Sequence, residues 1–393
     1  MKSKRILSAA CLFAIILSLC VFLGSCKTST STYYVPQENI SYNYNNICAQ
    51  SSSYWLENDA AYSLSMFSNV IKKADKDGLH TLVSNMDSTV PCPVKSGDLI
   101  YLLDITDPFD EKIQYTLKSY NVKTDETKSC VTFDARSIDS YIILGDYLFF
   151  ADQEIFYEER MPTVIPTDLK CVSIKTGNCT TVAEDILGFG VVNEKVRYVF
   201  DSLYTHGIYE YDTEREESAL IGEFTYPLYR DDQFRTAVNF TSDQVIFILD
   251  SFEDDKPISR LVKHDISSGK TDTFMNDVAD ITYAVAFEKY VFVTAKDPDG
   301  EDYHLFRVSL DSLEAEDMGK VHRWSDLFVS SDDTVYIANY LIEDITVIER
   351  YTVNKEKEAV MKFKGINKFL VDKFYYEFED SFLEKIAKWL YVE

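Results

Sequence analysis

Carboxylates placed at alternate positions are the clearest sign of possible chemistry in this sequence. Asp297, Asp299 and Asp302 surround Gly300 in the segment DPDGED. Hard oxygen ligands beside a glycine turn suit Ca²⁺, although an EF-hand loop has a bidentate glutamate further along the chain. The segment is therefore either a calcium site or an ordinary acidic turn, and no other cofactor is expected.

Further acidic residues gather in short polar segments between apolar runs. On one face of a protein, such carboxylates could bind a cation or a basic partner, and the alternative is a set of solvated loops. The chain has 39 basic and 65 acidic residues and a formal net charge of -26. Such a surface repels phosphate backbones, so nucleic acid is not an expected partner. The candidate residues of a ligand-binding face are Asp107, Asp110, Glu158, Glu159, Asp254 and Asp255.

Catalytic motifs are missing from the sequence, which contains no HExxH, GxSxG or phosphate-binding loop pattern. A single histidine in a strand is more often packed than catalytic. A pair of carboxylates of the glycosidase kind could still be assembled from distant segments. The sequence therefore favours binding without catalysis, with a carbohydrate-active hydrolase or lyase as the alternative. The five histidines are His80, His206, His264, His304 and His322.

The first 26 residues have the composition of a targeting segment. A basic start, MKSKR, precedes an apolar run over residues 6–23 that ends in LGSC. This ending resembles the bacterial lipobox, in which a leucine and small residues precede a lipidated cysteine. The resemblance implies cleavage before Cys26 and acyl chains, such as palmitate, that anchor the protein to a membrane on its extracytoplasmic side, at the cell surface or facing the periplasm. An uncleaved transmembrane anchor and plain secretion are the alternatives.

Eight cysteines are present, and five remain once residues 1–25 and Cys26 are set aside. An odd number outside the cytoplasm leaves at least one free thiol or an intermolecular partner. Cys171 and Cys179 flank a turn and could bridge across a hairpin, and Cys48 with Cys92 is the other candidate pair. No CxxC pair occurs, so structural zinc is not expected.

The candidate site residues lie between short runs in which apolar and polar residues alternate, a pattern of strands rather than helices. Residues 281–319 hold four such runs separated by polar breaks, which indicates a four-stranded antiparallel meander. Aromatic residues make up 14% of the chain, with 27 Tyr and 25 Phe, and they favour half-buried sheets. We therefore expect an all-β protein.

The same unit recurs along the chain at steps of 38 to 49 residues, measured between the starts of the second strands. A period in this range indicates a propeller or a solenoid, in which each unit buries its faces against its neighbours. The second strands are expected to begin at Ala61, Leu99, Tyr147, Val196, Val245, Tyr290, Thr334 and Phe374.

These repeats resemble the blades of bacterial β-propeller lipoproteins, the broad group that includes the YncE-like and TolB-like propellers. The likeness covers roughly residues 52–393 and rests on the order of turn, aromatic strand, loop and third strand, as in LFRVSLDS and LVKHDISSGK. It implies a seven- or eight-bladed β-propeller of four-stranded antiparallel blades. The WD dipeptide and the Asp-box are missing, which argues against two other propeller families.

Three parts of the chain are expected: a signal peptide over 1–25, a lipidated cysteine with a polar tether over 26–51, and one propeller domain over 52–393. The eighth repeat, from Lys368, is incomplete. Its last segment, FLEKIAKWLYV, is either a third strand or a terminal amphipathic helix. In the first case residues 32–35 or 40–44 supply the fourth strand of an eighth blade, and in the second case seven full blades remain.

Connections between second and third strands share one face of a propeller with the links between blades, and this face usually carries function. The longest such connection is expected over residues 152–167, where Pro162 and Pro166 restrict the chain. It could cover a channel mouth, form a contact surface or pack on the blades. We expect the protein to bind a protein or glycan ligand through this face, with a structural role in an envelope complex as a further alternative.

Overall fold

The computed structural model describes the chain from Tyr54 to Lys364, with gaps. Among the described residues there are 29 strands and no helix, so the fold is all-β. Within this part of the chain, nothing forms an apolar helix of the length that a bilayer requires. The described residues are 54–57, 60–65, 70–75, 78–83, 94–96, 98–106, 113–158, 161–200, 205–226, 233–234, 238–253, 256–276, 278–296, 302–321, 326–331, 334–341, 345–352 and 355–364.

The strands form seven antiparallel sheets, each built from strands that are consecutive in the chain. The first sheet contains β1 (Tyr54–Glu57), β2 (Ala60–Ser65), β3 (Val70–Asp75) and β4 (Gly78–Val83). The second contains β5 (Val94–Ser96), β6 (Leu99–Thr106), β7 (Ile113–Asn121) and β8 (Glu126–Ala135). The third contains β9 (Ile138–Leu144), β10 (Tyr147–Glu158), β11 (Met161–Ser173) and β12 (Cys179–Ala183).

The remaining four sheets repeat this arrangement. The fourth contains β13 (Ile186–Val192), β14 (Lys195–Phe200), β15 (Thr205–Asp212) and β16 (Glu217–Thr225). The fifth contains β17 (Gln233–Phe234), β18 (Asn239–Phe240), β19 (Gln244–Glu253), β20 (Lys256–Asp265) and β21 (Thr271–Phe274). The sixth contains β22 (Asp280–Ala286), β23 (Tyr290–Lys296), β24 (Tyr303–Ser309) and β25 (Ala315–Val321). The seventh contains β26 (Asp326–Ser331), β27 (Thr334–Leu341), β28 (Ile345–Thr352) and β29 (Lys355–Lys364).

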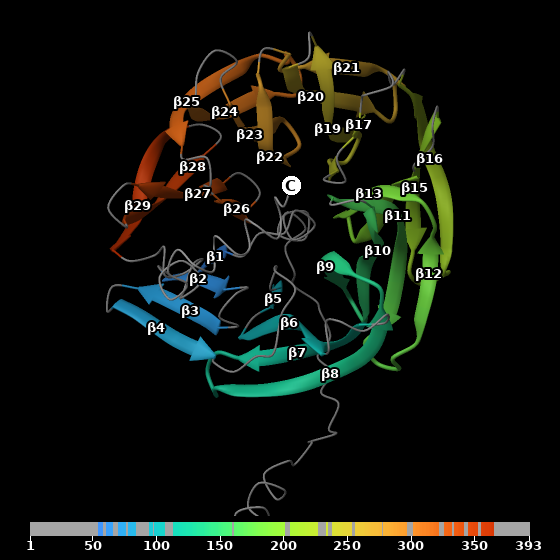
Figure 1. Ribbon diagram of the computed structural model, residues 1–393, viewed down its shortest axis with the longest axis vertical. Coiled ribbons are helices and arrows are strands. Elements are labelled where there is room, and N and C mark those ends of the chain that lie inside the picture. The colour runs from blue at the N-terminus through green and yellow to red at the C-terminus, as the bar shows by residue number, and fades with distance from the viewer. Residues whose placement is uncertain are drawn as a thin grey trace, which may run out of the picture.

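The seven sheets stand around a common axis in chain order, as the blades of a propeller (Figure 1). The first strand of a blade lies near the axis and the fourth lies at the rim. β1 lies against β26, so the described sheets close the ring, and they do so without exchanging a strand. The structure thus confirms a β-propeller and gives seven blades among the described residues. The alternative of an eighth blade, from Lys368, and its candidate closing strands, in residues 32–35 or 40–44, lie outside the described residues.

Burial explains why the middle strands are apolar on both faces. A blade in the ring has a neighbour on each side, and alternate residues of a strand point to opposite sides. In β10, Leu148 and Phe150 pack with the second sheet, while Phe149 packs with the fourth. Rim strands such as β16 are largely exposed. The core of the ring therefore consists of apolar layers between adjacent blades, as expected for a repeat protein.

The predicted starts of the second strands agree with the structure. β6, β10, β23 and β27 begin at the predicted residue, and β2, β14 and β19 begin one residue earlier. The strand predicted at Phe374 lies outside the described residues. The aromatic runs located these strands because a strand with a blade on each side has to be apolar on both faces.

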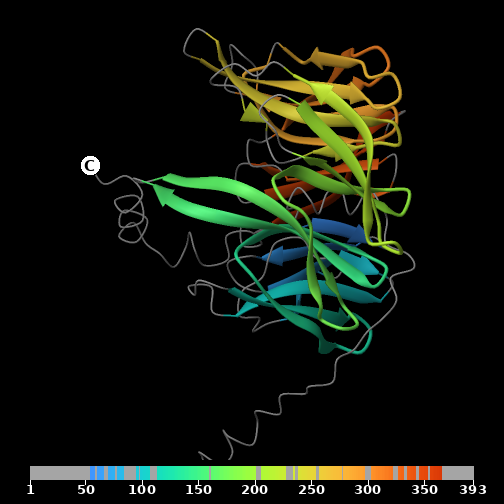
Figure 2. The same ribbon diagram turned by 90° about the vertical axis from the view of Figure 1, so that its right-hand side faces the viewer.

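The prediction of a loop over residues 152–167 is wrong. β10 continues to Glu158 and pairs with β11 from Met161 onward, so this segment is a long hairpin that projects from the ring (Figure 2, green). The prolines that suggested a loop lie within β11. Pro162 is paired with Tyr157, and Pro166 is the extra residue where the register shifts. Strands accept proline at an edge or a bulge, so the prolines do not end this one.

The candidate bridge between Cys171 and Cys179 is not formed, because both thiols are free. β11 and β12 pair Cys171 with Thr180, which places Cys179 on the other face of the sheet. Cys171 is buried and Cys179 is exposed. Burial raises the pKa of the Cys171 thiol to about 12, so this cysteine stays protonated and unreactive. The other candidate pair, Cys48 with Cys92, lies outside the described residues.

Candidate functional site

Strand order defines two faces of the ring. Successive strands of a blade run antiparallel, so the connections between second and third strands gather on one face, together with the links between blades. We call this side the loop-bearing face. The turns between first and second strands, and between third and fourth strands, lie on the opposite face.

A two-stranded arm extends from the loop-bearing face (Figure 2). We define the arm as residues 153–158 of β10 and 161–167 of β11. Within the blade, β9 pairs with β10 only as far as Asp152, and β12 pairs with β11 only as far as Leu169. Beyond these points the described strands of the arm pair with each other alone.

A group of charges around the buried Asp152 lies at the root of the arm. Asp152 is fully buried and accepts hydrogen bonds from the backbone N–H of Arg136 at 2.7 Å and from its Nε at 3.2 Å. Lys170 Nζ also contacts the carboxylate of Asp152. Arg136 Nη2 donates to Asp168 Oδ2 at 2.6 Å and to the carbonyl oxygen of Asp152 at 2.7 Å. Two cations and two anions thus cancel, which a buried charge requires.

Further contacts tie the root of the arm to the connection that leads in from the second blade. Arg136 and Ser137 belong to the connection between β8 and β9, that is, between the second and third blades. Gln153, the first residue of the arm, donates its backbone N–H to Ser137 O at 2.9 Å. One residue further, the backbone N–H of Ile138 donates to the hydroxyl of Tyr115 at 3.1 Å. The arm is therefore held from two blades rather than hinged on one.

A matching pair in the second blade shows that part of this arrangement is repeated. Asp104 is the sixth residue of β6, as Asp152 is of β10, and it is almost fully buried against Lys118. Each lysine is paired across the strands with the residue two positions before the aspartate. Sequence analysis missed both pairs. Alignment of the repeats on their second strands would have found them, because a charge inside an apolar strand stands out.

The predicted ligand-face residues belong to connections whose flanking strands end on the loop-bearing face. Glu158 is the last residue of β10, at the end of the arm, and Glu159 follows it. Glu253 of β19 pairs with Lys256 of β20, so the segment between these strands contains two residues, the predicted Asp254 and Asp255. The residues outside the described part of the chain are Asp107, Asp110, Glu159, Asp254, Asp255, Asp297, Asp299 and Cys26.

Asp302 is the one residue of the candidate calcium site that the structure describes. Its exposed carboxylate contacts the ammonium group of Lys320 on β25. This hydrogen bond and the positive charge of Lys320 lower the pKa of Asp302. The described residues contain no group of three or more His, Cys, Asp or Glu that could hold a metal ion.

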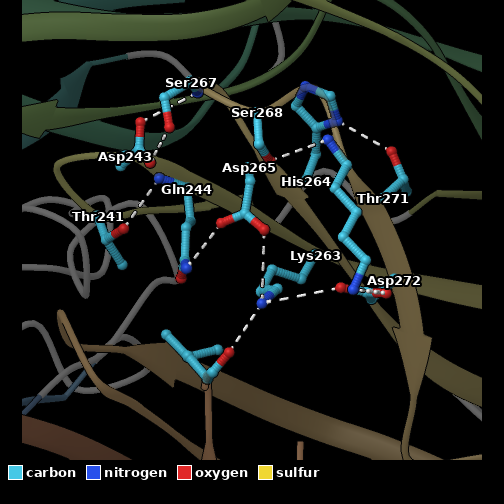
Figure 3. Close-up of polar contacts among 12 residues, drawn as sticks. Thr241, Asp243, Gln244, Lys263, His264, Asp265, Ser267, Ser268, Thr271 and Asp272 are labelled. Atoms are coloured by element: carbon cyan, nitrogen blue, oxygen red, sulfur yellow. Dashed lines mark hydrogen bonds and ion pairs between the residues drawn. The ribbon is translucent and has the colours of Figure 1, made fainter. Parts of the chain in front are cut away.

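A polar cluster on the opposite face joins the fifth and sixth blades (Figure 3). The buried Lys263 donates from Nζ to Leu310 O, in the sixth blade, at 2.7 Å. The same Nζ lies 3.6 Å from Asp265 and 3.9 Å from Asp272. Gln244 donates from Nε2 to Asp265 at 2.9 Å. These charges satisfy one another, so the cluster is best explained as a join between blades.

Arg197 makes a similar join between the fourth and fifth blades. Its Nη1 donates to Thr241 O and Ser242 O, each at 2.9 Å, and its Nε donates to Glu210 at 3.2 Å. Burial raises the pKa of Glu210, but hydrogen bonds from Lys195 and Arg197 outweigh it and hold the pKa below its ordinary value. The carboxylate of Glu210 is thus kept charged by its structural partners.

Two of the five histidines are fully buried between the fourth and fifth blades. His206 stacks on Phe224 with the ring centroids 4.8 Å apart, and the ring centroid of His264 lies 5.1 Å from that of the same Phe224. His264 Nδ1 also lies 2.9 Å from Thr271 Oγ1. Burial lowers the pKa of His264, so the ring is neutral near pH 7. These histidines serve packing between blades.

Comparisons with known proteins give fold likenesses only. No protein-family model matches the sequence, and no curated protein matches it. The chain is similar to an oligogalacturonate lyase in complex with manganese, at 12% identity and a TM-score of 0.46, over 66% of this chain and 76% of that one. It is similar to the β-propeller domain of the Trilobed protease from Pyrococcus furiosus, at 16% identity and a TM-score of 0.42. This match covers 68% of this chain and 96% of that one. Oligopeptidase B from Leishmania major matches at 8% identity and a TM-score of 0.48, over 81% of this chain, which spans half (50%) of that protein.

The closed ring of antiparallel blades defines this protein as a β-propeller. The narrower resemblance to YncE-like and TolB-like lipoproteins stays a prediction. The feature that distinguishes the third blade from the other described blades is the arm, with the buried Asp152 and its charged partners at the root.

Proposed function

We propose that this protein is a lipid-anchored β-propeller on the extracytoplasmic side of a membrane, and that it binds a partner through its loop-bearing face without catalysis. The partner is a protein or a glycan, and the net charge of -26 disfavours nucleic acid. The single observation that supports this proposal is the arm. It stands on the face where propellers usually carry function.

The construction of the arm supports binding rather than packing. A hairpin that only covered its own blades would lie flat on them, whereas this one extends outward from the ring (Figure 2). A two-stranded hairpin is marginally stable by itself in water. Here Asp152, Arg136 and Lys170 fix its root, and the Gln153 to Ser137 hydrogen bond ties it to the connection that precedes β9. A projection whose root is fixed loses less entropy on binding than a free segment would.

Charge indicates the kind of partner. The chain carries a formal net charge of -26, and the segments next to the loop-bearing ends of the strands are rich in carboxylates. Such a surface attracts cationic groups over about 8 Å at physiological salt and speeds their association. A basic partner is therefore favoured. Calcium bound by Asp297, Asp299 and Asp302 is the alternative use of these carboxylates, and the contact of Asp302 with Lys320 counts against it.

The anchoring half of the proposal rests on the ending LGSC and predicts acyl chains on the sulfur of Cys26. Growth with a labelled palmitate should label the wild-type chain and leave a Cys26→Ala variant unlabelled. The variant should also move from the membrane fraction to another fraction. A labelled Cys26→Ala variant, or an unlabelled wild type in membranes, would contradict the lipid anchor.

The binding half can be tested with a photo-reactive residue placed on either face in intact envelopes. Thr163, in the arm, is the test position, and Ser268, an exposed residue in a turn of the opposite face, is the matched control. Adducts of a defined mass are expected from position 163 and not from position 268. Equal adducts from both positions, or none from position 163, would overturn binding through this face. Turnover of a polysaccharide by the purified protein would instead favour the carbohydrate-active alternative.

A further inference from the structure

The two outer edges of the arm differ, and hydrogen-bond direction shows how. The N–H of Gln153 points to the β9 side of β10, because it donates to Ser137 O at 2.9 Å. N–H groups of a strand point alternately to its two sides. Those of Ile155 and Tyr157 therefore point to the same side as that of Gln153. Among the described strands, β9 no longer runs beside β10 at these residues, since its pairing with β10 ends with Ile138 opposite Asp152.

The opposite edge of the arm, on β11, is closed by prolines. Ile155 is paired with Val164, and Tyr157 is paired with Pro162. Because Ile155 and Tyr157 direct their N–H groups outward, the residues opposite them occupy outward-facing positions as well. Pro162 has no N–H to offer there, and Pro166 is the extra residue at the register shift. Proline on an edge and a local bulge are two devices by which proteins prevent a further strand from pairing.

The outer edge of β10 in the arm is therefore the edge that accepts a strand. It offers the backbone groups of Ile155 and Tyr157 in an extended conformation. Pairing along such an edge gives affinity through main-chain hydrogen bonds, and the side chains beside it give selectivity.

Charge decides which strand fits this edge. β10 carries Glu154 and Glu158 within the arm, and the one basic residue nearby in sequence is Arg160. A second copy of the chain, paired antiparallel about Phe156, would bring Glu154 opposite Glu158, and like charges directly opposite are destabilising. Two chains of charge -26 also repel each other. A basic segment meets neither obstacle.

We infer that the outer edge of β10, residues 153–158, binds an extended lysine- or arginine-bearing segment of a partner protein as an added strand. This inference rests on the proposed function, because it names the part of the loop-bearing face that makes the contact. It also names the partner as a protein rather than a glycan.

Selection from a random decapeptide display library on the purified mature protein tests this inference. Enriched peptides should alternate apolar residues with lysine or arginine. Ile155→Pro removes an outward N–H from the accepting edge and should weaken a selected peptide about tenfold, the effect of one main-chain hydrogen bond. Val164→Pro is the matched control in the same row of the arm, on the edge that proline already closes. It should change the peptide affinity by less than about threefold.

Two further measurements guard against an indirect effect of proline. Hydrogen exchange on the wild-type protein should show slower exchange of the Ile155 and Tyr157 amides when the peptide is bound. Two versions of the peptide are N-methylated at every second residue, one at the odd and one at the even positions. The version that lacks the N–H groups facing the arm should lose binding, and the other version should keep it. Both measurements use the unmodified protein, so they decide the question even if Ile155→Pro unfolds the arm.

Several results would overturn the inference: no enrichment above the empty matrix, enrichment of acidic peptides, or equal binding to wild type and Ile155→Pro with no amide protection. Self-association of the protein that Ile155→Pro abolishes would identify a second copy as the occupant. The envelope experiment separates the two levels. If position 163 still forms adducts while Ile155→Pro leaves them unchanged, the face binds but this edge does not. If position 163 forms none, the proposed function itself is wrong.

Discussion

At the scale of single residues, Asp152 holds the arm to the ring through its contacts with Arg136 and Lys170. Its carboxylate is fully buried. It contacts Arg136, in the connection between β8 and β9, and Lys170, in β11. A buried ion pair contributes little net stability compared with an apolar replacement, but removal of one partner leaves the others unpaired. Asp152 therefore acts mainly by fixing where the arm leaves the ring.

Replacement of Asp152 by alanine should lower the free energy of unfolding by about 3 kcal/mol, the lower end for breaking a buried pair. The lower end applies because the side chains of Arg136 and Lys170 keep 32% and 22% exposure to water. Urea denaturation measures this change. Asp302→Ala, which removes an exposed partner of Lys320, is the matched control and should have little effect. Equal losses in the two variants would contradict the assigned role.

His264 gives a prediction about acid. Burial lowers the pKa of His264 in the folded state below its ordinary value near 6.5, so the unfolded chain binds a proton more readily. The contribution of His264 to stability must therefore fall as the pH decreases below about 6.5. His264→Phe keeps an aromatic ring beside Phe224 and removes the titration. The difference in unfolding free energy between pH 7.5 and pH 5.5 should be smaller in this variant, and an unchanged difference would show that His264 does not titrate.

At the scale of elements, the arm is separate from the rest of the third blade. The blade portions of β10 and β11 pair with β9 and β12, whereas the arm portions pair with each other. The number of strands paired with β10 and β11 therefore falls near the register shift after Gln153. We expect the ring to fold whether or not the arm is present.

Deletion of the arm tests this separation. Joining Gln153 to Thr167 through Asn-Gly, a favoured two-residue hairpin connection, should keep the ring and lower its midpoint of thermal unfolding by less than about 5 °C. Binding of a peptide selected on the wild-type protein should be lost. Circular dichroism follows the first result, and a peptide-binding measurement follows the second. A ring that fails to fold without the arm would show that the arm is part of the core.

At the scale of the whole molecule, stability comes from the layers between blades. Phe247 is fully buried in the layer between the fourth and fifth blades, 5.0 Å from Phe224 between ring centroids. Joins such as Lys263 to Leu310 and Arg197 to Thr241 add hydrogen bonds between neighbouring blades. Since β1 also lies against β26, each blade of the described ring is supported on both sides.

A cavity in one layer should therefore weaken the ring as a whole. Phe247→Ala should lower the free energy of unfolding by about 3 to 5 kcal/mol, the range for a large aromatic residue in a core. Leu220→Ala, at an exposed position of the rim strand β16, should change it by less than about 0.5 kcal/mol. Urea unfolding should stay a single transition in both variants. Two separated transitions in Phe247→Ala would show that the blades unfold independently.

Much of the fold could be predicted from the sequence because its cause is local. Strands such as β6 and β23 are apolar on both faces, and the aromatic runs at Leu99 and Tyr290 mark them directly. The candidate site was predicted less well. Pro162 and Pro166 suggested a loop, although the same residues belong to a paired strand when Tyr157 lies opposite. Asp152 gave no sign of Arg136, which lies 16 residues earlier, in the connection between two blades.

The sequence by itself determined an all-β chain of repeated units, because alternation along a strand and recurrence along the chain are written in neighbouring residues. The tertiary structure alone decided the register of β10 on β11, the neutral charge cluster at the root of the arm and the closure of the ring between β1 and β26. Each of these depends on contacts between residues far apart in the chain. Local residue types leave such contacts open, and the packing of whole blades selects among them.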